Sequence, residues 1–251
     1  MRTVCTIVVG WQAFEGAPIV VAANRDERLA RESTPPAVRE DDVDYLAPRD
    51  EEAGGTWMGV NEHRVFAGLT NRWVDADLHA ERSRGLLLND VLGKATDASE
   101  AIAIVQAAVD ANDYEGFNVV VADPEEAHLL EYDGTRTSRR LDPGVHVLIN
   151  TGADGSYTIP DSSSEIAKRQ AENADRVREV LSPKLDETAD EWLERGKGIL
   201  GDHEYGVCVH GDGYGTISTS LIAVWEDGTI DYAYADGPPC ETDTRHVDGH
   251  I

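Results

Sequence analysis

The chain has 251 residues, of which 41% are hydrophobic, and 48 acidic residues against 22 basic ones give it a formal net charge of -26. A chain of this length and apolar content can bury a substantial core, and no linker rich in Pro, Gly and Ser divides it. We therefore expect one domain over residues 1–251, with residues 236–251 as a flexible acidic tail that contains histidines. The charge disfavours nucleic acid and anionic lipid as partners, because both require a basic surface.

The acidic residues also indicate the environment of the protein. They are scattered among apolar periodic segments, so we interpret them as the surface of a folded protein and not as a disordered tail or a store of cations. A net charge of -26 repels itself in the compact state unless concentrated salt screens it. Only Lys94, Lys168, Lys184 and Lys197 are lysines, and all the other basic residues are arginines. This pattern is typical of a protein from an extreme halophile.

Two features of the chain bear on its location. No apolar run reaches the roughly 18 residues that would span a bilayer. The N-terminus lacks the basic, apolar and small-residue pattern of a secretory signal. We therefore expect a cytoplasmic protein without membrane insertion.

The N-terminal segments have the composition of strands. Thr3–Trp11 and Ile19–Ala23 are rich in β-branched residues, and the Gly-Ala-Pro turn between them predicts a hairpin whose first strand carries Cys5. A second pair of short strands is expected at Trp57–Val60 and Arg64–Thr70.

The rest of the chain alternates between helical and strand patterns. Apolar residues spaced three and four apart predict helices around Leu86–Leu92 and over Ala98–Ala111. The later expected elements are strands Phe117–Ala122, Ala127–Tyr132 and His146–Asn150, helices Ser164–Leu181 and Glu187–Ile199, and a closing hairpin of Thr216–Glu226 with Thr229–Tyr234. Blocks of strands separated by blocks of helices indicate the α+β class with segregated helices, not a doubly wound parallel sheet.

Polar residues follow three of the apolar strands. The first group is Asn24, Arg25, Asp26 and Glu27. Taken alone, this group is explained by a surface turn with an Arg–Asp ion pair that contributes about 0–1 kcal/mol. Asn71 and Asn150 each follow another strand, where a single Asn commonly caps a turn. If the two amides point to the same place, they suit an oxyanion hole for acyl transfer.

Cys5 is the candidate nucleophile for such a hole. A thiol on a first strand is more often a small core residue than a catalyst. However, Arg25 and its polar neighbours would lower the pKa of the thiol and favour the reactive thiolate. Trp57 and Trp73 flank the strand that ends at Asn71, and they would form the walls of a pocket for an apolar acyl group or a planar ligand.

The C-terminal part of the chain contains several residues of the types that bind metals. His203, Cys208 and His210 share one Gly-rich loop, and His246 and His250 lie near the end. The Cys-x-His pair supplies two ligands where zinc requires four, so the sequence predicts no metal site. Three cysteines without short paired spacings predict neither a disulfide framework nor a zinc ribbon.

Several strings of the sequence occur together in an order and spacing that resemble a known family. The strings are Ala23-Asn24-Arg25-Asp26-Glu27, Asp50-Glu51-Glu52-Ala53-Gly54-Gly55-Thr56-Trp57-Met58-Gly59-Val60, Thr70-Asn71, Arg82-Ser83-Arg84-Gly85, Gly116-Phe117-Asn118, Leu141-Asp142-Pro143-Gly144-Val145 and, more weakly, Tyr214-Gly215-Thr216. The chain resembles the transport and Golgi organisation family, which is named for its Asn-Arg-Asp-Glu motif. This family is in turn similar to the N-terminal-nucleophile hydrolases of the choloylglycine hydrolase and penicillin V acylase type.

The resemblance implies a fold, an activity and roles for individual residues. The implied fold is a four-layer αββα sandwich with antiparallel sheets. The implied activity is that of a cysteine amidohydrolase or acyl-transfer enzyme, which acts on a small amide, ester or thioester and requires no cofactor. The implied catalytic residues are Cys5 as nucleophile with its freed α-amino group as base, Arg25 and Asp26 as organisers, and Asn71 and Asn150 as oxyanion and orienting donors. The implied substrate-binding residues are Asn24, Glu27, Trp57, Trp73 and Arg169.

The residues before Cys5 leave a second function open. Met1–Val4 precede it, whereas an N-terminal nucleophile uses its own α-amine, with a pKa of about 8, as the base. Either the start codon is misassigned, or these residues are removed, or the site is inactive. In the last case the chain would be a non-enzymatic protein that binds or traffics haem or an acyl ligand. Candidate axial haem ligands are Cys5, His63, His79, His128 and His146.

Overall fold

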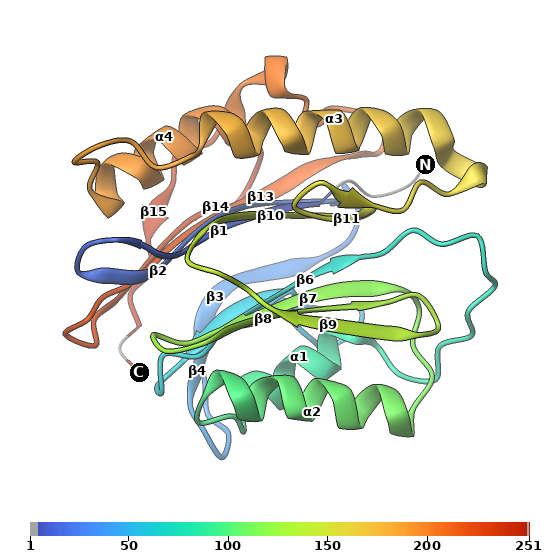
Figure 1. Ribbon diagram of the computed structural model, residues 1–251, viewed down its shortest axis with the longest axis horizontal. Helices are drawn as coiled ribbons and strands as arrows, with labels where there is room; N and C mark the ends of the chain where they lie inside the picture. The colour runs from blue at the N-terminus through green and yellow to red at the C-terminus, as the bar shows by residue number, and fades with distance from the viewer. Residues whose placement is uncertain (1–4, 250) are drawn as a thin grey trace. The chain divides into compact units, whose positions relative to one another are not determined.

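The computed structural model describes residues 5–249 and 251, which fold as two compact units (Figure 1). The first unit contains the chain up to Ala30 together with Pro143–Val247, and the second contains Arg31–Asp142 and the residues from Asp248 onward. Each unit has its own antiparallel sheet, its own helices and its own apolar core. The single domain expected from the sequence stays a prediction.

The first unit is built on an eight-stranded sheet. Its strands are β1 (Thr6–Phe14), β2 (Ala17–Arg28), β10 (Gly144–Ile149), β11 (Gly152–Ala153), β12 (Ser156–Tyr157), β13 (Tyr214–Val224), β14 (Ile230–Ala235) and β15 (Arg245–His246). They are ordered β12-β11-β10-β1-β2-β13-β14-β15, and all neighbours are antiparallel. The β-branched runs of β1 and β2 therefore lie at the centre of the sheet, where both faces are buried.

Helices α3 (Ser164–Val180) and α4 (Ala189–Gly201) pack on one face of this sheet, as Figure 1 shows. The Trp192 side chain of α4 is fully buried, and its ring lies 5.5 Å from that of Phe14. A capping box at Thr188 and Glu191 begins α4. The short 3-10 helices η1 (Asp161–Ser163) and η2 (His203–Tyr205) precede α3 and follow α4.

The second unit has a seven-stranded sheet and two helices. The strands are β3 (Ser33–Arg39), β4 (Tyr45–Asp50), β5 (Met58–Asn61), β6 (Phe66–Asn71), β7 (Phe117–Ala122), β8 (Ala127–Tyr132) and β9 (Arg136–Arg140), in that order across the sheet. Helices α1 (Arg84–Leu92) and α2 (Ala98–Ala111) cover one face of it. Among the described residues, no helix combines the length and the apolar character needed to cross a bilayer.

The structure confirms the α+β class, the antiparallel sheets and all four expected helices. It adds strands that carry no clear apolar alternation. Strand β3 is an edge strand with two prolines, Pro35 and Pro36, at an irregularity in its pairing, and prolines are tolerated at such places because they need not donate to the ladder. The side chains of the other edge strand, β9, are all exposed, so burial left no pattern in its sequence.

Two expectations about the ends of elements change. The sequence predicts that the polar group Asn24 to Glu27 follows a strand that ends at Ala23, but β2 continues to Arg28 because β13 pairs with it from Ile19 to Arg28. The segment expected as a tail contributes the edge strand β15, which pairs with β14. His250 and Met1–Val4, on which the sequence also carried expectations, lie outside the described residues.

Candidate functional site

Cys5 lies immediately before β1, next to the residue that follows β10. The pairing of Thr6 with Ile149 brings Cys5 and Asn150 together, and the backbone nitrogen of Cys5 donates to Asn150 Oδ1 at 2.8 Å. Gln170 on α3 donates to the same oxygen at 2.9 Å, and Asn150 is fully buried. The Asn150 oxygen therefore positions the Cys5 nitrogen. If the Asn150 side chain donates a hydrogen bond to an oxyanion, the donor atom must be its Nδ2.

The Cys5 side chain is half-buried, and its thiol hydrogen-bonds to the backbone of the motif. Its Sγ donates to the backbone oxygen of Asp26 at 3.6 Å. Burial is the largest cause that raises the pKa of the thiol to about 12, the negative charge of Asp26 adds to the shift, and the positive charge of Arg25 opposes it. Arg25 lowers the pKa of Cys5, as expected, but burial and the charge of Asp26 raise it by more, so the net shift does not favour the thiolate.

Asp26 is buried beside its neighbour on β13. Thr216 pairs with it, and Thr216 Oγ1 donates to Asp26 Oδ1 at 2.5 Å. Asp26 Oδ2 is also buried and has no hydrogen-bond partner within residues 5–249. Burial raises the pKa of the carboxyl well above its usual range, and the hydrogen bond from Thr216 only partly opposes this. A bulge in β13 directly after Thr216 shifts the register beside this residue.

The other members of the motif differ in their surroundings. Asn24 is 2% exposed, and its Nδ2 donates to the backbone oxygens of Leu200 and Val207 at 3.0 and 2.9 Å. Its Oδ1 accepts from Thr219 Oγ1 at 2.7 Å. This set of bonds favours a structural role over the substrate-binding role expected for Asn24. Arg25 is also buried, whereas Glu27 is half-buried.

Three expected site residues belong to the second unit. Asn71 ends β6, as expected, and is half-buried. Trp73 is buried, and Trp57 is half-buried just before β5. In the first unit, Arg169 is exposed on α3 next to Gln170. The structure thus brings Cys5, Asp26 and Asn150 together, and the roles of Asn71, Trp57, Trp73 and Arg169 stay predictions.

Two residues of this site were not assigned a role from the sequence. Gln170 belongs to a helical pattern, in which a buried Gln has no distinguishing mark. Thr216 enters the sequence argument only through the string Tyr214-Gly215-Thr216, which carries part of the family resemblance. Its strand, β13, also carries Ser218, Thr219 and Ser220, so Thr216 is not distinguished by the sequence pattern.

The histidines considered as haem ligands are dispersed. His146 Nδ1 lies 2.8 Å from Asp154 Oδ2, and His128 Nε2 lies 3.1 Å from Glu126 Oε2. His63 and His79 are exposed. The positions of these histidines do not test whether the protein binds haem, so haem binding stays a prediction.

Comparisons with known proteins agree with the fold. The chain is similar to the penicillin V acylase of Agrobacterium tumefaciens, with a TM-score of 0.59, 12% identity, and coverage of 97% of this chain and 86% of that one. It is also similar to the conjugated bile acid hydrolase of Clostridium perfringens, with a TM-score of 0.55, 12% identity, and coverage of 99% and 98%. At this identity the likeness shows the fold alone, which is that of the N-terminal-nucleophile hydrolases.

Sequence comparison identifies the family. The human protein described as "Transport and Golgi organization protein 2 homolog" is 26% identical over 236 residues, which cover 85% of this chain and 84% of the human protein. The sequence profile of the family "Transport and Golgi organisation 2" matches residues 4–234. This match spans β1 to β14 and includes Cys5, the Asn-Arg-Asp-Glu motif and Asn150, so the chain belongs to the Transport and Golgi organisation 2 family.

Proposed function

We propose that this protein is a cysteine-nucleophile amidase that cleaves an N-acyl amide once Cys5 has become the N-terminal residue. The observation that carries the proposal is the 2.8 Å hydrogen bond from the Cys5 nitrogen to Asn150 Oδ1. This bond fixes the atom that would be the free α-amine, in the residue that also carries the thiol. An α-amine with a pKa of about 8 is suited to take a proton at neutral pH.

The proposed reaction has two steps. The α-amine of Cys5 takes the proton from Sγ, and the sulfur attacks the carbonyl carbon of the amide. A donor then stabilises the negative oxygen of the tetrahedral intermediate, a role we assign to Asn150 Nδ2. The C–N bond breaks, and the protonated α-amine returns its proton to the leaving amine. In the second step, water attacks the Cys5 thioester, the C–S bond breaks, and the acid is released with the thiol restored.

Arg25 and Asp26 would organise this reaction without touching the scissile bond. The backbone oxygen of Asp26 accepts from Cys5 Sγ and so sets the direction of the thiol. The positive charge of Arg25 acts to lower the pKa of the thiol. Burial is the largest cause of the raised pKa and therefore the main obstacle to thiolate formation, so the reaction depends on a base positioned next to the thiol.

The proposed substrate class rests on the structures that share the fold. One is named as an acylase of penicillin V and the other as a hydrolase of conjugated bile acids. We therefore propose an amide of an apolar acyl group. Glu27 and Arg169, which belong to the same unit as Cys5, would contact the polar end of this substrate.

One observation favours the second candidate function, that of a ligand-binding protein for haem or an acyl compound. With the chain continuing before Cys5, the thiol has a pKa of about 12 and is a poor nucleophile. The uncleaved chain would then bind an acyl group without hydrolysing it.

The test compares two forms of the protein in concentrated salt. One is the full chain, and the other is a chain that begins Met-Cys5, from which the host removes the methionine. Intact mass verifies both N-termini. Amine release from penicillin V and from a conjugated bile acid is then measured, with Cys5→Ala in the short form as the matched control.

The proposal expects hydrolysis by the short form, a thioester adduct of the acyl mass on Cys5, and loss of both in Cys5→Ala. A short form that has the circular dichroism of the full chain, yet neither hydrolyses these amides nor reacts with an acyl probe at Cys5, would contradict the amidase. Retention of haem or of an acyl compound by both forms, unaffected by Cys5→Ala, would then support the binding protein.

A further inference from the structure

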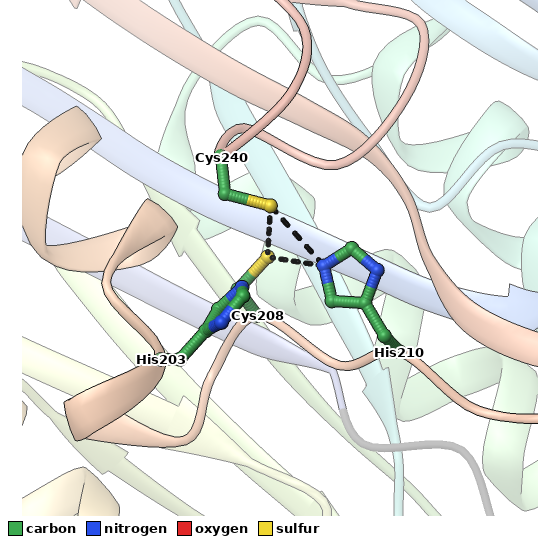
Figure 2. Close-up of side chains that lie close together, drawn as sticks. All are labelled: His203, Cys208, His210 and Cys240. Atoms are coloured by element: carbon green, nitrogen blue, oxygen red, sulfur yellow. Dashed lines mark hydrogen bonds between the residues drawn. The ribbon is translucent and has the colours of Figure 1, made fainter.

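Four metal-ligating side chains of the first unit meet at one point. They are His203, Cys208, His210 and Cys240, and their ligand atoms all lie within 4.8 Å of one another. Figure 2 shows the sulfur atoms of Cys208 and Cys240 and the ring of His210 turned toward one another, and the convergence of His203 on them follows from the distances. We propose that these residues bind one structural Zn²⁺ ion.

The distances between the ligand atoms fit a tetrahedral ion. With Zn–S of about 2.3 Å and Zn–N of about 2.0–2.1 Å, the edges of the tetrahedron are about 3.8 Å between two sulfurs and about 3.6 Å between sulfur and nitrogen. The Sγ atoms of Cys208 and Cys240 are 3.5 Å apart. His210 Nε2 lies 3.6 Å from Cys208 Sγ and 3.1 Å from Cys240 Sγ. The cluster is therefore within a few tenths of an ångström of zinc geometry on the three edges that join these atoms.

The local backbone explains why Cys208 and His210 converge. His210 forms a bridge with Gly215, and Thr216 N donates to Val209 O at 2.8 Å, so this segment is extended alongside the start of β13. In extended backbone, side chains two residues apart point to the same side. A Cβ on Gly215 would lie 2.6 Å from Val209 O, so this close approach requires glycine. The Cys-x-His pair therefore presents two ligands to one ion.

The other two ligands come from separate turns. His203 begins η2, where its ring centroid lies 5.0 Å from that of His210. Cys240 lies in the turn between β14 and β15, where Glu241 and Thr242 donate backbone hydrogen bonds to Pro238. The sequence prediction of no metal site failed to count Cys240, because 30 residues separate it from His210 and only the fold brings them together.

The ligand set indicates both the metal and its role. Two thiolates and two imidazoles in a tetrahedron are typical of Zn²⁺, whereas Ca²⁺ and Mg²⁺ prefer oxygen ligands. Four protein ligands leave no position for substrate, which is the mark of a structural site. On binding, each thiol releases its proton to solvent as its Zn–S bond forms. The ion would then join the turn that carries Cys240 to the connection between α4 and β13.

A disulfide between Cys208 and Cys240 is the competing explanation. Their Sγ atoms are 3.5 Å apart, while a disulfide bond measures about 2.05 Å. A disulfide also gives no reason for His203 and His210 to converge on the same sulfurs. A metal explains all four residues with one ion.

The test uses the full chain, reduced and stripped of metal in concentrated salt, and titrated with Zn²⁺ and separately with Co²⁺. We expect about one ion per chain, tetrahedral Co²⁺ bands with a sulfur charge-transfer band, and displacement of Co²⁺ by Zn²⁺. In the same wild-type protein, Zn²⁺ should protect Cys208 and Cys240 from iodoacetamide but leave the labelling of Cys5 unchanged. This readout does not depend on whether a variant folds.

Variants then assign the ligands. Cys208→Ser combined with Cys240→Ser should reduce bound Zn²⁺ to below about 0.1 per chain. Two matched controls, Cys5→Ser and His246→Ala, should each retain about one ion per chain. The proposal is overturned if the reduced wild type shows no tetrahedral Co²⁺ spectrum and no protection. It is equally overturned if the double variant binds as much metal as wild type.

Discussion

Thr216 Oγ1 donates a hydrogen bond to Asp26 Oδ1 at 2.5 Å, and the same hydroxyl accepts one from the backbone nitrogen of Val209 at 2.9 Å. One side chain therefore connects the buried carboxyl of the candidate active site to the residue between two proposed zinc ligands, Cys208 and His210. Both contacts lie within the first unit. The relationship predicts that changes at Thr216 affect the two places together.

Thr216→Val should destabilise the protein more than its small change in shape suggests. Thr216 is 3% exposed, and the substitution leaves an oxygen of Asp26 and the Val209 nitrogen without their partner. We expect the free energy of unfolding to fall by about 2–4 kcal/mol, measured by denaturant titration at fixed pH and salt. Thr216→Ser keeps the hydroxyl and serves as the control. Equal stability of the two variants would show that these hydrogen bonds contribute nothing.

Asp26 should make the protein less stable as the pH rises. Its pKa in the folded state is raised well above the ordinary value of 3.8, mainly by burial, so the folded chain holds a proton that the unfolded chain has lost. Above a pH of 3.8, stability should therefore decline until the pH passes the raised value. Asp26→Asn cannot titrate, so the difference in unfolding free energy between the variant and wild type should grow in favour of the variant as pH increases. A difference that is constant with pH would contradict a raised pKa.

Asn24 should be a stabilising residue of the first unit. It donates to the backbone oxygens of Leu200 and Val207 and accepts from Thr219, all at buried positions. Asn24→Ala removes all three bonds, and we expect a loss of about 3 kcal/mol in unfolding free energy. The control is Asn173→Ala, because Asn173 makes a single 3.5 Å bond to Gly206 O in the same unit. If the two variants lose equal stability, the role of Asn24 lies elsewhere, and substrate binding becomes the better explanation.

The sequence predicted those helices and strands whose buried residues recur in a regular pattern. The central strands β1, β2 and β13 are runs of buried β-branched residues, and α2 and α3 show the spacing of a half-buried helix, so these elements could be located from pattern alone. Edge strand β9 could not be located, because it is wholly exposed and its pairing depends on a neighbour and not on its own residues.

The candidate site was predictable only in part, and for related reasons. Cys5 and Asn150 stand beside paired strands, so two correctly placed strands and a resemblance were enough to select them. The environment of a residue was not predictable: Asn24 and Asp26 belong to the same motif, yet the first anchors a loop and the second faces Thr216. Cys240 could not be grouped with Cys208 and His210 from the sequence, because the turn after β14 is what brings it next to them.

The thiol of Cys5 should react slowly in the full chain. A pKa of about 12 leaves very little thiolate at pH 8, so alkylation should be on the order of 10³-fold slower than for an unperturbed thiol. Peptide mapping after timed exposure of the metal-free, reduced chain to iodoacetamide gives the rate for each cysteine, with exposed Cys240 as the internal reference. The rate of Cys5 alkylation should rise about tenfold for each pH unit while the pH stays below the pKa of the thiol. Rapid labelling of Cys5 near pH 7 would show that the thiol is already activated without removal of the preceding residues.

Concentrated salt should stabilise the protein strongly, as we propose for a halophilic chain with a net charge of -26. The Debye length falls from about 10 Å at 0.1 M salt to about 3 Å at 1 M, so repulsion between surface carboxylates is largely screened at the higher concentration. We expect the midpoint of thermal unfolding to rise with KCl between these concentrations at neutral pH. Two controls separate charge screening from solvent exclusion. The first is sucrose at matched osmolality, which is excluded from the protein surface but does not screen charges. The second is an acidic pH at which the net charge of the protein approaches zero. A stabilisation by KCl that sucrose reproduces, or that persists unchanged at the acidic pH, would mean that charge repulsion is not what the salt relieves.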